Sequence, residues 1–127
     1  MKLWKYSGVF LMITGILHVA IAILEGKETL VAILKDGFDS IGSDVLRNQA
    51  FWFLICGVII IFWGQTLHFY IKKTRTPLPS SLGWSLLIIS LVGCFFVPVS
   101  GFWLFIPQAL IMILASRNSK AINSEQK

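Results

Sequence analysis

Few side chains in this chain can do chemistry, and the two histidines and two cysteines are the first to consider. His18 lies two-thirds of the way along one apolar run, and His68 lies near the end of the next. At the rise of a helix the two would stand about 13 Å apart along the axes, so we do not expect a shared metal or haem. Cys56 and Cys94 lack the Cys-x-x-Cys spacing of thiol redox centres and are interpreted as small buried thiols, with their pairing left open.

A polar pair is expected from His18 and Gln108, which both lie about 10 Å below the same end of their apolar runs. Pro107 has no N–H, so the Trp103 carbonyl loses its helical partner nearby. One interpretation is that the pair, or this carbonyl, forms hydrogen bonds that hold two helices in register. The other is that the pair forms the polar end of an apolar pocket. The candidate ligand-binding residues are then His18, Gln108, Glu25, Thr14 and Trp103.

Enzymatic motifs are missing from the sequence. We find no Walker loop, no nucleophile elbow and no metal-hydrolase motif. We therefore expect no catalytic residue, no metal and no cofactor. The sequence does not decide whether the protein is an enzyme, but the missing motifs favour a protein without catalytic activity.

The composition indicates a chain built for a bilayer. Of 127 residues, 56% are hydrophobic and 13% are charged, about half the charged share of a soluble domain. So apolar a chain is not disordered, and two cysteines do not make a disulfide scaffold. The net charge of +5 comes from small basic clusters that border the apolar runs, which argues against nucleic-acid binding.

Four apolar runs predict an all-α bundle of four transmembrane helices in a single domain, residues 1–127. The stretch 81–115 would be about 50 Å long as one helix, which is too long for one crossing, and Pro98-Val99-Ser100-Gly101 interrupts it. The expected spans cover residues 6–24, 51–71, 81–97 and 102–115.

Charge predicts the orientation. Eight of the eleven basic residues fall at the N-terminus, in the second connection and in the tail, and five of the six acidic residues fall on the opposite side. The positive-inside rule then places both termini in the cytoplasm. The first connection also carries an approximate helical pattern over Glu28–Ile41, broken near Asp36-Gly37. It predicts a short amphipathic segment that lies on the outer surface or covers the bundle.

Small and polar residues recur every seventh position, which predicts a left-handed bundle joined along narrow seams. The seam residues are Ser7, Thr14, His18 and Glu25 beside Gly8, Gly15 and Ala22; then Ala50, Gly57, Gly64 and His68; then Gly83, Ser90 and Cys94; then Gly101, Gln108 and Ala115.

The segments LWKYSG, TGILH, FWFLICG and VPVSGFWLFIPQALI resemble those of a group of small bacterial four-helix membrane proteins known as a domain of unknown function. The resemblance covers nearly the whole chain. It implies four spans and a bacterial cytoplasmic membrane, and it carries no catalytic residue, ligand or cofactor.

Two functions remain for such a protein. The first is binding of a lipid or small apolar molecule in a pocket open to the outer leaflet. The alternative is an accessory subunit, whose seam packs against another membrane protein or a second copy of the chain. An enzyme acting on a lipid or quinone ranks third, and no nucleic-acid partner is expected.

Overall fold

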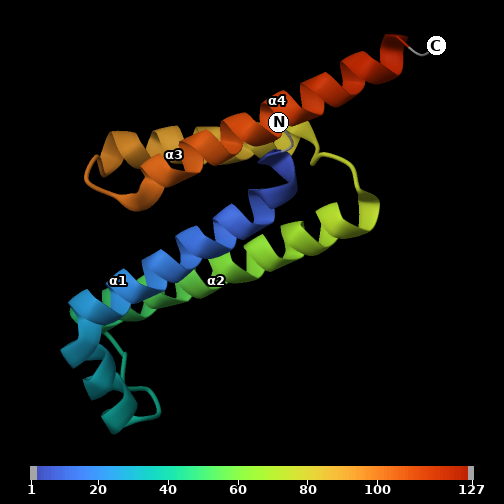
Figure 1. Cartoon of the computed structure of the whole chain (residues 1–127). Coiled ribbons are helices and arrows are strands. Elements are labelled where there is room, and N and C mark those ends of the chain that lie inside the picture. Colours follow the sequence, from blue (N-terminus) through green and yellow to red (C-terminus); the bar gives the residue numbers. More distant parts are fainter. Residues whose placement is uncertain (1–2, 126–127) are drawn as a thin grey trace.

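The chain forms four α-helices in two hairpins (Figure 1). This computed structural model describes the backbone of residues 3–125 and the side chains of residues 3–119. A 3-10 turn, η1 (Leu3–Tyr6), leads into α1 (Ser7–Asp36), which is followed by α2 (Val45–Thr74) and α3 (Ser80–Phe96). A second 3-10 turn, η2 (Gly101–Leu104), leads into α4 (Phe105–Glu125). The predicted all-α class and the four helices are confirmed, and residues 3–125 contain no strand.

The two hairpins form two layers. In Figure 1 the α3–α4 hairpin lies above the α1–α2 hairpin, and α1 and α4 are the helices that join them. Contacts between the hairpins are much sparser than those within each. The fold is therefore two tight helix pairs with a limited joint between them.

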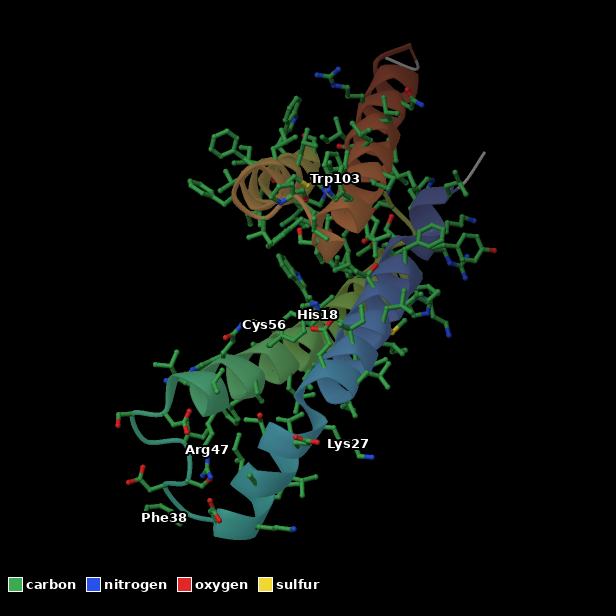
Figure 2. The ribbon with its side chains drawn as sticks, turned by 90° about the vertical axis from the view of Figure 1, so that its left-hand side faces the viewer. His18, Lys27, Phe38, Arg47, Cys56 and Trp103 are labelled. Atoms are coloured by element: carbon green, nitrogen blue, oxygen red, sulfur yellow. The ribbon has the colours of Figure 1, made fainter. Side chains whose placement is uncertain are left out.

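The first helix is longer than its apolar run. It continues to Asp36 instead of ending near residue 24, so the expected separate surface segment is the last part of α1. Figure 2 shows the helix changing direction near Lys27, which follows Gly26, a residue type at which helices bend. The predicted break at Asp36-Gly37 is confirmed, because the helix ends there and Gly37 has a φ of 74°. In Figure 1 this part turns away from the second hairpin, so it does not cover the bundle.

The connection between α1 and α2 is held by polar contacts. Asp44 caps α2 by accepting hydrogen bonds from the N–H groups of Leu46 and Arg47 at 2.9 and 3.1 Å. Arg47 in turn pairs with Asp36 at 2.7 Å and donates to the Ser40 carbonyl at 2.6 Å. Because of this cap, α2 begins at Val45 rather than near residue 51, outside the apolar run from which the span was predicted.

The second hairpin follows its predicted boundaries at α3 but not at α4. The last helix continues beyond Ala115 to Glu125, because polar residues there extend the helix past the apolar run. Pro107 is the third residue of α4, where its missing N–H has no helical partner to lose, so the helix is not interrupted.

The glycine part of the seam between α1 and α2 is confirmed, whereas Glu25, predicted to lie along the same seam, is exposed. An added Cβ at Gly15 would lie 2.8 Å from the Ile61 amide nitrogen and 3.0 Å from the Gly57 carbonyl, and one at Gly8 would overlap the His68 backbone. The seam predicted for α4 is wrong in part. Gly101 faces open space, and the residues that α4 buries are Gln108, Ala109, Met112, Ile113 and Ser116.

Large apolar side chains cover the outside of the protein. Leu24, Phe62 and Phe95 are 80%, 69% and 80% exposed, and many others resemble them. Among the described residues, the helices over Leu3–Asp36 and Val45–Thr74 are long and apolar enough to cross a membrane by length and composition. The apolar helix α3 is shorter.

Candidate functional site

One buried polar pair joins the two hairpins. The Nε2 of Gln108 in α4 donates to the Oγ of Thr14 in α1 at 2.8 Å. The Thr14 hydroxyl in turn donates to the Phe10 carbonyl at 2.9 Å. Each of these two side chains is 7% exposed. The pair therefore fixes the position of α4 along α1 from inside the core.

The side-chain carbonyl of Gln108 does not take part in this hydrogen bond. Its Oε1 is buried and has no hydrogen-bond partner among the described residues. A buried polar atom without a partner costs about 1–3 kcal/mol, and most such atoms in proteins are paired. The site therefore has a buried acceptor on α4 that no described group uses.

An apolar crevice lies one helical turn from the pair. It has about 10 Å³ of free volume, roughly room for one water-sized sphere. Leu11 is one turn before Thr14 and Met112 is one turn after Gln108. The lining residues are Leu11, Trp63, Leu67, Leu82, Leu86 and Met112.

His18 does not pair with Gln108. Its Nε2 lies 3.1 Å from the Phe53 carbonyl, and its ring packs on the Phe53 ring with 4.2 Å between centroids. The expected His18–Gln108 hydrogen bond is therefore wrong, since Gln108 bonds to Thr14, one turn nearer the start of α1. Depth was predicted by counting residues from the end of each apolar run. Such a count does not determine the axial position of one hairpin relative to the other.

The remaining predicted residues lie outside the joint. The Trp103 indole donates to the Pro98 carbonyl at 2.8 Å and so closes the connection between α3 and α4. Glu25 is exposed, near the bend of α1. Figure 2 shows His18 on the first hairpin and Trp103 on the second. Of the five candidate residues, the structure joins only Thr14 and Gln108 by a hydrogen bond.

A second feature was not predicted as a site. Residues from η1 and from the end of α2 surround a groove of about 340 Å³. The sequence shows their basic clusters, but these were interpreted only as signs of orientation. The cysteine interpretation needs a correction as well: Cys94 is buried, Cys56 is exposed, and both are free thiols.

These features define a small all-α protein with an apolar exterior, two tightly packed hairpins and a buried polar joint. The chain belongs to a family of unknown function, DUF6463, whose model matches residues 2–119. Comparison with curated proteins and with solved structures found no match.

Proposed function

We propose that the chain is a four-span integral protein of the bacterial cytoplasmic membrane, with a left-handed bundle and both termini in the cytoplasm. The apolar exterior supports this proposal, because exposed apolar patches of this extent are rare on soluble monomers. The distribution of charge along the sequence supports the orientation, since most basic residues fall at the N-terminus, in the second connection and in the tail.

We further propose that the protein binds a lipid or another small apolar molecule at the joint. The sequence predicted a pocket open to the outer leaflet, but the crevice is lined by Leu67 near the end of α2 and Leu82 near the start of α3, so in the proposed topology it lies in the cytoplasmic half of the bilayer. The unpartnered Oε1 of Gln108 carries this proposal. It would accept a hydrogen bond from a hydroxyl or N–H group at the polar end of the ligand. The apolar body would follow the crevice beside Leu11 and Met112. Because the crevice has only about 10 Å³ of free volume, binding would require the sparsely joined hairpins to move apart.

Native mass spectrometry of the protein purified from bacterial membranes in mild detergent tests the binding role. The wild type is expected to retain a small molecule, and Gln108→Leu to lose it while the bundle stays folded. Gln65→Leu makes the same chemical change at an exposed position of α2 and should retain the ligand. A protein retained equally by all three chains would instead support the accessory-subunit role and overturn ligand binding.

Cysteine labelling tests the topology. In a chain with Cys56→Ala and Cys94→Ala, a thiol at the exposed position Ser43 should react with a membrane-impermeant reagent from outside intact cells. A thiol at Thr76 should react only after the cells are opened. Labelling of Ser43→Cys from the cytoplasm alone would reverse the proposed orientation.

A further inference from the structure

A groove between η1 and the end of α2 is lined by basic side chains from both elements. Its volume, about 340 Å³, falls within the usual size of small-ligand pockets. One wall comes from η1 and the other from the last turns of α2. The lining residues are Trp4, Lys5, His68, Ile71, Lys72 and Arg75.

The positive charge in the groove is not neutralised by the described part of the protein. Both ion pairs found among the described side chains involve Arg47, in the first turn of α2 at the other end of the first hairpin. Lys5, Lys72 and Arg75 have no such partner there. The end of α2 contributes about half a negative charge from its dipole, which three cations outweigh. The groove is therefore an attractive place for an anion.

Tight packing fixes the two walls relative to each other. Gly8 has no Cβ, and one placed there would overlap the backbone of His68, so α1 and α2 approach closely at this level. Lys5 is one turn before Gly8 and Lys72 is one turn after His68, so both lie at the same end of the pair. Arg75 ends α2 in a left-handed conformation with φ of 54°, its N–H bonded to the Ile71 carbonyl at 2.9 Å.

Two further groups at the groove suit an amphipathic ligand. The Nδ1 of His68 is buried and has no hydrogen-bond partner among the described residues. Trp4 presents an aromatic wall, with the Lys5 ammonium 5.9 Å from its ring centroid. With Ile71, Trp4 gives the groove an apolar side next to its basic side.

We propose that this groove binds a phosphoryl anion, whose source is the head-group phosphate of an anionic phospholipid. Lysine and arginine are the side chains that bind phosphate oxygens, and clusters of them at a membrane surface recognise anionic lipids. Trp4 and Ile71 would contact the glycerol and the first methylenes of the lipid. The site is separate from the Thr14–Gln108 pair, so either can fail without the other.

The test is a titration of the purified full chain in an uncharged detergent, followed by calorimetry. Dioctanoyl phosphatidylglycerol is expected to bind at least about tenfold more tightly than dioctanoylglycerol, which has the same tails and no phosphate. Lys72→Gln should weaken binding of the phospholipid about tenfold or more. Lys73→Gln removes the same charge from the next, exposed residue, which does not line the groove, and should change binding less than about twofold.

Circular dichroism and gel filtration of each variant exclude unfolding as the cause, and Gln65→Leu, at an exposed position outside both sites, should bind the phospholipid as the wild type does. A second titration uses inorganic phosphate alone as the competitor of the phospholipid. If phosphate displaces the lipid at millimolar concentration and Lys72→Gln abolishes this, the phosphoryl site stands and its source is soluble. Equal losses in Lys72→Gln and Lys73→Gln, or equal affinity for the two lipids, would overturn the proposal.

Discussion

Replacement of Gly15 by alanine tests the packing of the first hairpin most directly. The new Cβ would lie 2.7 Å from the Cγ1 of Ile61, 2.8 Å from its amide nitrogen and 3.0 Å from the Gly57 carbonyl. Carbon atoms in contact prefer about 3.5–4.0 Å, so α1 and α2 must separate by roughly half an ångström or more. A gap of that size forfeits about a quarter of the dispersion energy of the contacts it opens.

Gly26→Ala is the matched control in the same helix. Its Cβ would lie 3.6 Å from the Ala50 Cβ, an ordinary contact. Both variants gain the same helix propensity, about 0.5–1 kcal/mol, so the difference between them isolates the contact at Gly15. We expect Gly15→Ala to be less stable than Gly26→Ala by about 1–3 kcal/mol, the usual cost of an overpacked core.

Reversible unfolding in mixed micelles of increasing dodecyl sulfate content, followed by circular dichroism, measures this difference. If the two alanine variants unfold at the same detergent composition, α1 and α2 do not pack through Gly15. The close contact with Gly57 and Ile61 would then be refuted.

Three further changes have defined outcomes. Thr14→Val removes the acceptor of the buried amide and should destabilise the protein by about 1–3 kcal/mol in the same unfolding assay, while the exposed Thr66→Val should change it by less than about 0.5 kcal/mol. Trp103→Phe removes the hydrogen bond that closes the α3–α4 connection, so amide exchange should rise at residues 97–104 and stability fall by about 0.5–1.5 kcal/mol. Arg47→Ala breaks the contacts across residues 37–44, so amide exchange should rise there while global stability changes by less than about 1 kcal/mol.

The sequence predicted the helices well where periodicity carries physical information. The seam of Gly8 and Gly15 against Gly57 and Gly64 follows from residues seven apart, because such residues lie on one line of a helix and small ones allow close approach. Helix ends were predicted less well. Apolar runs mark where hydrocarbon would end, whereas α1 and α4 continue through polar residues that remain good helix formers.

The candidate site shows what periodicity leaves undetermined. Thr14 and Gln108 were both candidates, but Gln108 was expected to meet His18, which is one turn further along α1. Position around a helix follows from the sequence of that helix alone. The position of a residue along a neighbouring helix depends on how the two hairpins dock. A shift of about 6 Å along α1 would bring His18 rather than Thr14 next to Gln108. The basic groove was missed for a related reason, since its two walls are far apart in the sequence.

Contacts within the first hairpin differ in rigidity from contacts between the two hairpins. Within the first hairpin, backbones approach at glycines, and such contacts tolerate little movement because backbone atoms of the facing helix lie close to each glycine. Between the hairpins, the contacts include the side chains of leucines, Trp63 and Met112 and one amide that bonds to a hydroxyl. Side chains of this kind can change rotamer and partner at low cost, and methionine is the most adaptable of them. A ligand at the joint would therefore displace one hairpin against the other rather than open a helix pair, and the unpartnered acceptor of Gln108 belongs to the one hydrogen-bonded pair described between the hairpins.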